Sequence, residues 1–276
     1  MTPGEAREGF KRCLATPEPE LDLAEGALWI AAEAYPELRP AAYLDRLDRM
    51  SADLKGRIRT ETEPGSVVSI CNRYIFEELG FRGNRDEYYD PRNSFLNDVM
   101  DRRLGIPITL SVVFVSIGER AGLPVRGVGM PGHFLVKYEP AGGRSEILID
   151  PFNTRVISRE ECAAMLKEMY GAETELRPSF FKASPKRQIL ARILNNLKGI
   201  YLSRGDLLQA LAASDRIVLA DPQLTAEWRD RGLIEFQLRR DSAALADFTR
   251  YLALRPEPED ANRIRQLRFE LLGRLN

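Results

Sequence analysis

Apolar residues recur every three to four positions through most of the first 80 residues, which is the spacing of amphipathic helices. The clearest run lies within Leu21–Ala31, and a second predicted helix covers Pro40–Thr60. A third covers Ser66–Leu79 and carries Cys71 on its apolar side, where we expect a buried thiol rather than a reactive one. The pattern therefore predicts a helical region over residues 1–80.

The pattern changes between residues 94 and 155. A short helix is predicted over Phe95–Arg103, and the segment after Pro107 is apolar on every side, which is typical of a buried helix. Three stretches of strand length and β-branched content follow, namely Val125–Met130, His133–Glu139 and Ser145–Asp150. Because a Pro- and Gly-containing turn joins the last two, we expect a small antiparallel sheet, and hence an α+β class for this part.

Beyond the Pro-flanked linker Arg177–Pro185 the helical pattern repeats itself. Asn195–Pro222 superposes on Arg229–Pro256 at an offset of 34 residues, so that both units share an Ala-Leu pair and a terminal proline. This period and these residues resemble the tetratricopeptide repeat. A last predicted helix, Glu259–Leu275, would then cap the array by covering its exposed apolar end.

Composition removes several classes of function. With 40 basic and 41 acidic residues, the chain has no net field to attract nucleic acid or an anionic membrane. The apolar run Ile106–Gly118 is shorter than the roughly 20 residues that span a bilayer, and the N-terminal residues lack a signal-peptide pattern. Three scattered cysteines fit a reducing cytoplasm, and a single histidine excludes a His-rich metal centre. We expect no metal and no cofactor.

The single histidine belongs to a candidate polar pair. If Tyr138 pairs with Ser145 across the turn, His133 falls opposite Asp150, and directly opposed side chains lie about 5 Å apart at Cβ. A slip of one residue would place them on opposite faces. We therefore predict that His133 and Asp150 are neighbours.

Three segments of this region are 102–110 (RRLGIPITL), 129–134 (GMPGHF) and 149–152 (IDPF). With the helical repeats, they resemble the bacterial SirB-type family, which joins a transglutaminase-like domain of the papain type to C-terminal tetratricopeptide repeats. The resemblance implies that His133 matches the general base of the active enzymes and Asp150 its orienting carboxylate. It also implies a nucleophilic cysteine at the start of the buried helix, where this chain has Pro107.

Proline offers neither a nucleophile nor an N–H to an oxyanion. Thr109 and Ser111 lie near the same helix end and are weak candidates for a substitute hydroxyl, although helical geometry does not bring them to the position of the lost thiol. Hydroxyls on buried helices usually bond to a backbone carbonyl one turn back. Candidate residues lining the site are Tyr88, Tyr89, Asn93, Gly105 and Gly132.

We predict a transglutaminase-like domain over residues 1–180, with its core at 94–155, and an all-α repeat domain over 186–276. The first hypothesis is a non-catalytic scaffold or regulator that binds a protein or peptide through its repeats. The alternative is a hydrolase or acyl-transferase of altered mechanism, in which His133 and Asp150 activate water or a hydroxyl. A regulator acting on nucleic acid is the weakest reading, since neither charge nor motif supports it.

Overall fold

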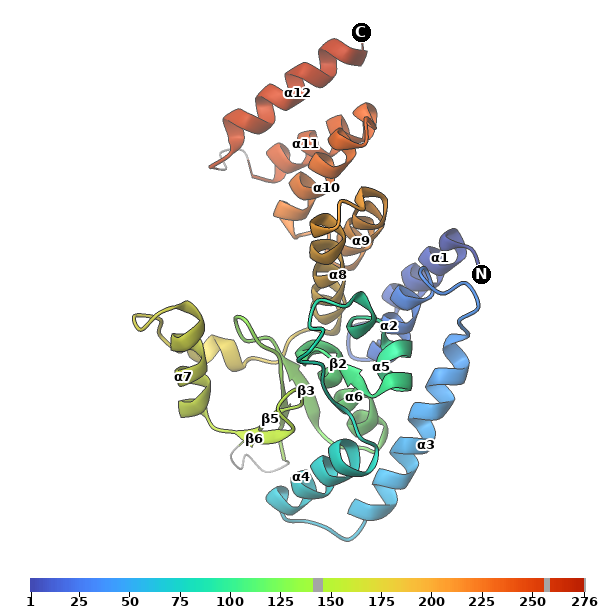
Figure 1. Ribbon diagram of the computed structural model, residues 1–276, viewed down its shortest axis with the longest axis vertical. Coiled ribbons are helices and arrows are strands. Elements are labelled where there is room, and N and C mark those ends of the chain that lie inside the picture. The colour runs from blue at the N-terminus through green and yellow to red at the C-terminus, as the bar shows by residue number, and fades with distance from the viewer. Residues whose placement is uncertain (141–145, 256–258, 276) are drawn as a thin grey trace. The chain divides into compact units, whose positions relative to one another are not determined.

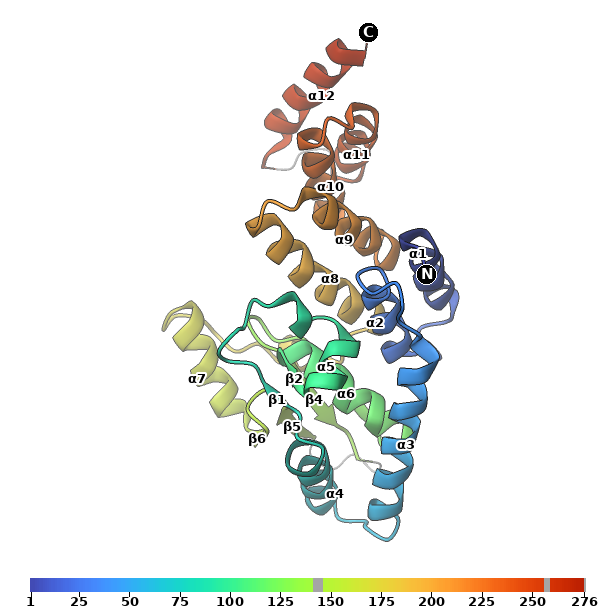
Figure 2. The same ribbon diagram turned by 45° about the vertical axis from the view of Figure 1, so that its right-hand side comes forward.

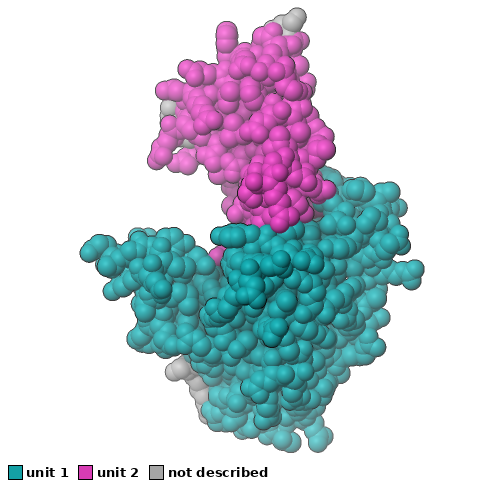
Figure 3. All heavy atoms as spheres, in the orientation of Figure 1, with its two compact units in different colours: residues 1–189 teal, residues 190–276 magenta. Residues whose placement is uncertain are grey.

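The computed structural model describes residues 1–140, 146–255 and 259–275. The chain divides into two compact units, Met1–Ile189 and Leu190–Asn276, which Figure 3 colours separately. The first unit combines helices with small sheets, whereas the described part of the second is helical. The predicted class, a helical region and an α+β core followed by all-α repeats, is confirmed.

Four helices form the N-terminal part of the first unit: α1 (Pro3–Ala15), α2 (Leu23–Ala31), α3 (Pro40–Ile58) and α4 (Pro64–Asn72). Local sequence explains their starts. Thr2 and Glu5 form a reciprocal capping box on α1, and the Asp22 carboxylate accepts backbone N–H groups of α2. The predicted helix Ser66–Leu79 is wrong in one respect, because α4 continues as a separate π-helical segment, Arg73–Glu78.

The buried helix α6 (Pro107–Arg120) is the centre of the first unit. It packs against α2, α3 and α5 (Leu96–Arg102) on one side and against the sheet on the other (Figures 1 and 2). Pro107 occupies its first turn, where the missing N–H would have no helical partner. The pattern did not predict two short strands, β1 (Arg82–Gly83) and β2 (Leu104–Gly105), which pair in parallel. Of the two, β2 directly precedes α6 in the chain.

A four-stranded antiparallel sheet has the order β3-β4-β5-β6. Its strands are Val125–Val128, Leu135–Tyr138, Ile147–Asp150 and Arg155–Ile157, and the last was not predicted. The predicted register is wrong by two residues, because Tyr138 pairs with Ile147; Ser145 lies outside the described residues. A shift of two keeps every side chain on its face, so the grouping of His133 with Asp150 survives the error.

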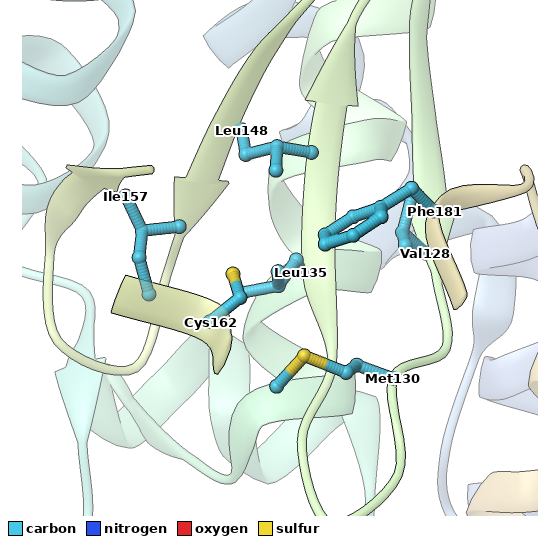
Figure 4. Packing of buried hydrophobic residues seen from close by; sticks show 7 residues of the cluster. All are labelled: Val128, Met130, Leu135, Leu148, Ile157, Cys162 and Phe181. Atoms are coloured by element: carbon cyan, nitrogen blue, oxygen red, sulfur yellow. The ribbon is translucent and has the colours of Figure 1, made fainter. Parts of the chain in front are cut away.

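One face of the sheet carries a compact apolar cluster, drawn in Figure 4. Side chains from all four strands or their ends meet Cys162 of α7 (Arg159–Tyr170) and Phe181 of a 3₁₀ turn (Pro178–Phe181). Ser158 caps α7 together with Glu161 in a reciprocal capping box. This cluster fixes the distance between α7 and the strand ends that carry His133 and Asp150.

The second unit contains two helical hairpins and a final helix. Their bounds are α8 (Lys186–Ser203, beginning in the first unit), α9 (Leu207–Ala220), α10 (Thr225–Gln237), α11 (Asp241–Leu254) and α12 (Ala261–Leu275). The equivalent residues Ala210 and Ala244 are both fully buried, as small residues inside a repeat should be. Pro256, the proline predicted to end the second repeat, lies outside the described residues. Among the helices described, none is long and apolar enough to cross a membrane.

Candidate functional site

His133 and Asp150 lie side by side at the ends of neighbouring strands. Nε2 of His133 is 3.0 Å from Oδ1 of Asp150. The Asp150 side chain is fully buried and that of His133 is 9% exposed. His133 precedes β4 rather than opening it, and follows Gly132, whose φ of +70° turns the chain. The arrangement therefore depends on a glycine turn as well as on strand pairing.

The Asp150 carboxylate organises the turn that follows β5. Its Oδ1 accepts the backbone N–H groups of Phe152 and Asn153, each at 3.1 Å, and its Oδ2 accepts Nδ2 of Asn153 at 2.6 Å. Burial raises the pKa of this carboxyl, but His133 and Asn153 together outweigh burial, and the pKa lies below its usual value. Asp150 is thus a charged group at neutral pH with a structural role as well as a contact to the imidazole.

Phe152 joins the polar pair to the loop before α5. Its ring meets His133 edge-on at 6.4 Å and Tyr88 at 5.9 Å between centroids, and the Arg85 guanidinium lies 5.1 Å from its centre. Gly83 lets the ring approach, since a Cβ there would lie 2.6 Å from it. Sequence reasoning missed Phe152, Arg85 and Asn153. The Asp-Pro-Phe-Asn run after a strand, a turn signal, was the one available indication.

The residues predicted to line the site have different surroundings. Tyr88 and Tyr89 contact each other and are 39% and 76% exposed, so they lie at the surface of the loop. Asn93 is fully buried, accepts a hydrogen bond from Asn84 and donates to the Glu87 carbonyl, which makes it a brace for the loop.

The two glycines of the predicted lining differ as well. A Cβ at Gly132 would meet Met169 at 2.7 Å and Tyr170 at 3.0 Å, so this glycine lets the end of α7 pack directly against the turn before His133. A Cβ at Gly105 would lie 2.9 Å from the Thr109 hydroxyl. The role of this glycine is therefore to let the backbone pass close to the first turn of α6. A hollow of about 930 Å³ beside Glu139 and Glu146 does not include His133 in its lining.

The hydroxyls near Pro107 are engaged with the backbone. Thr109 Oγ1 donates to the Asn93 carbonyl at 2.7 Å and accepts the N–H of Ile106 at 3.2 Å. Ser111 Oγ donates to the Pro107 carbonyl at 2.8 Å, one turn back. Both side chains are buried. In this arrangement their protons stabilise the helix start instead of facing a base.

The structure brings one cysteine into the neighbourhood of the pair. Cys162 on α7 packs in the apolar cluster next to Met130 and Leu135 and is fully buried. Burial, with the charge of Asp150 as the second cause, raises the pKa of its thiol to about 11. It is therefore held as a thiol and not as the thiolate that attacks carbonyl groups. Among the described residues, no group of His, Cys, Asp and Glu could hold a metal ion.

An α6-centred core with a His–Asp pair at the sheet ends, followed by helical repeats, defines a transglutaminase-like protein with tetratricopeptide repeats. The pattern of the Transglutaminase-like superfamily matches residues 41–195, and that of the Tetratricopeptide repeat matches residues 197–268. A UPF0162 protein of Xylella fastidiosa is 38% identical, with 91% of each chain covered. One of Pseudomonas aeruginosa is 30% identical over 96% of each chain, and Protein SirB1 of Salmonella typhimurium is 26% identical, with 80% and 82% covered. The chain belongs to this SirB-type (UPF0162) family.

Proposed function

We propose that this protein is a non-catalytic member of its superfamily that binds a protein or peptide through its C-terminal repeats, as a scaffold or regulator. The observation that carries the proposal is Pro107 at the first turn of α6. A covalent acyl-transfer mechanism needs a nucleophile whose proton a nearby base removes. Proline has no such atom, and the Thr109 and Ser111 hydroxyls beside it donate to backbone carbonyls.

The cysteines support the same conclusion. All three are free and buried. Burial raises the pKa of Cys13 and Cys71 to about 12 and that of Cys162 to about 11, so thiolate is scarce at neutral pH. Free thiols kept away from solvent also suit the reducing cytoplasm, where we place the protein.

The His133–Asp150 pair favours one alternative, a hydrolase that activates water. A buried, charged Asp150 holding Nε2 of His133 leaves Nδ1 as the ring nitrogen that could take a proton. Against this, the Asp150 carboxylate is largely committed to the turn made by Phe152 and Asn153. We interpret the pair as a support for the loop surface formed by Tyr88 and Phe152.

The two functions are separated by one pair of measurements on the full chain. Turnover of activated esters and of glutamine-containing peptides is compared for the wild type and His133→Ala. We expect equal background rates, whereas a His133-dependent rate would revive the hydrolase. In parallel, a photo-crosslinking residue is placed at Leu208 or Leu224 in the repeats, or at Tyr89 in the first unit. Crosslinks to a captured polypeptide from the repeat positions support the proposal, and their absence overturns it.

A further inference from the structure

Arg85, in the loop between β1 and α5, keeps its positive charge at the surface of the first unit. The residue is exposed, and within the described ranges its guanidinium forms no ion pair with a carboxylate. Its polar contact is to a neutral group, because Nη2 donates to Oδ1 of Asn153. The next arginines along the chain differ, since Arg92 lies 2.6 Å and Arg102 3.8 Å from the Asp90 carboxylate. Arg85 is thus a cation that remains available to a ligand.

Neighbouring groups fix the position of this guanidinium. It lies over the Phe152 ring, 5.1 Å from the ring centre. The ring packs so closely on Gly83 that a Cβ there would be 2.6 Å from it. The Asn153 amide is fixed as well, because its Nδ2 donates to the buried Asp150 carboxylate at 2.6 Å. A side chain that is already held in place loses less conformational entropy on binding, so Arg85 is preorganised for a ligand.

The bond to Asn153 leaves a complete pair of donors on the guanidinium. A guanidinium carries five N–H groups in a planar fork, and two of its edges present a pair of parallel N–H groups. Nη2 contributes one hydrogen to each of these edges, so the edge whose hydrogen Asn153 does not accept stays complete. Two parallel N–H groups match two oxygens of a carboxylate or a phosphate. Arg85 therefore has the geometry to bind such an oxyanion through two hydrogen bonds.

Aromatic rings adjoin the guanidinium. The Phe152 ring contacts Tyr88 at 5.9 Å between centroids, and Tyr88 contacts Tyr89 at 5.3 Å. Both tyrosines are exposed. A ligand with an apolar or aromatic group next to its oxyanion would remove part of this ring area from water, which is favourable. The surroundings of Arg85 therefore favour such a ligand over a bare inorganic ion.

Acidic residues of the same loop oppose an anion to a limited extent. Glu87 and Asp90 both lie near Arg92, at 3.8 Å and 2.6 Å. Asp86, which is next to Arg85 in the sequence, is exposed. An exposed like charge weakens the binding of an anion only modestly, because water and salt screen it. Removing the Asp86 charge should therefore strengthen binding.

We propose that Arg85, positioned by Phe152 and Asn153, binds the oxyanion of a ligand that carries an aromatic or apolar group beside it. A carboxylate and a phosphate share this chemistry, and both fit the fork of the guanidinium. All the residues involved belong to the first unit. The proposal therefore adds a second binding site to the chain and does not depend on binding through the repeats.

Binding is measured on the full chain by ligand-observed saturation-transfer NMR, with N-acetylphenylalanine and phenyl phosphate as probes. N-acetylphenylalanine amide has the same ring but no charge and is the matched control probe. We expect saturable binding of at least one anionic probe, and binding of the amide that is weaker by at least about tenfold. The probe that binds more tightly shows whether the oxyanion is a carboxylate or a phosphate.

Four variants locate the bound anion. Arg85→Gln removes the fork and its charge, and should weaken binding of the anionic probe by at least about tenfold. Arg85→Lys keeps the charge without the fork and should recover only part of that affinity. Arg82→Gln removes the same charge from another exposed arginine, three residues earlier, and should leave the affinity within about twofold. Asp86→Asn should strengthen binding by about twofold. Circular dichroism verifies that the variants are folded.

The proposal is overturned if neither anionic probe binds, if Arg85→Gln binds as tightly as the wild type, or if the amide binds as tightly as the anions. An effect of Arg82→Gln as large as that of Arg85→Gln would also overturn it, because the probes would then respond to net charge and not to a site. The crosslinking test of the proposed function is independent. If the repeat positions capture a polypeptide while no probe binds at Arg85, only this inference fails.

Discussion

At the scale of single residues, Asp150 determines how the candidate site is held. Its carboxylate is fully buried and serves both His133 and the turn containing Asn153. Asp150→Asn keeps the shape but removes the charge and turns one acceptor into a donor. We expect the free energy of unfolding to fall by about 1–3 kcal/mol at pH 7, measured by urea unfolding. Asp86→Asn, at an exposed residue of the nearby loop, should change it little.

The same substitution has a defined pH dependence. The pKa of Asp150 is lower in the folded chain than its usual value, so the folded state binds fewer protons at this group. Its stabilisation is complete above the unfolded pKa of about 3.9 and is lost as the pH falls through the folded pKa. The difference between wild type and Asp150→Asn should therefore shrink below about pH 4. A difference that stays constant down to pH 2 would show that the charge contributes nothing.

The thiols give a second test at this scale. Because burial raises the pKa of Cys13, Cys71 and Cys162, a thiol reagent at pH 8 should modify the folded protein far more slowly than the unfolded chain. Mass spectrometry of the labelled peptides identifies which residue reacts. Rapid labelling of Cys162 in the folded protein would contradict its assignment to the closed apolar cluster and would reopen the search for a nucleophile.

At the scale of elements, the spacing of apolar residues predicted the helices whose burial follows from their own sequence. The helix α6 is apolar all round and begins at a proline, so its place in the core followed from its sequence. The register of β4 and β5 did not, because it depends on the turn between them, and the error of two residues left the faces unchanged. The strand β6 has two exposed residues among its three and gives no alternating signal. Phe152 joined the site only through tertiary contacts, which no local pattern contains.

In each repeat a small residue on one helix accompanies a large residue on the other, but the two repeats place the small residue on different helices. Gly232 faces Phe248 in the second repeat, and at the equivalent positions of the first a large residue, Lys198, accompanies a small one, Ser214. Gly232→Ala should destabilise the protein by about 1–3 kcal/mol, because its Cβ would press on the Phe248 ring. Gly199→Ala is the control, since nothing lies within 4 Å of its added Cβ, and it should gain about 0.5–1 kcal/mol. Thermal unfolding of both variants measures the two signs.

Lys198 is also the counterion of a buried acid. Its Nζ lies 2.6 Å from Oε2 of Glu227, whose other oxygen accepts the Ser214 hydroxyl, and burial raises the pKa of Glu227 in spite of these partners. Lys198→Met should therefore lower the free energy of unfolding by about 3 kcal/mol, because it leaves a buried carboxylate without its cation. Adding Glu227→Gln should restore part of the loss in urea unfolding. If the double variant is as unstable as the single one, packing rather than charge is responsible.

At the scale of the whole molecule, each unit has an apolar cluster of its own. Leu135 belongs to the cluster of the sheet, and Phe248 to that of α10, α11 and α12. Both are fully buried, so truncation to alanine should reduce stability by about 2–5 kcal/mol in either case. Because the clusters share no residue, we expect local loss of protection from hydrogen exchange. Phe248→Ala should accelerate exchange in α10–α12 and leave α6 and β3–β6 protected, and Leu135→Ala should do the reverse. Simultaneous loss in both units after either substitution would instead show that the chain unfolds as one cooperative body.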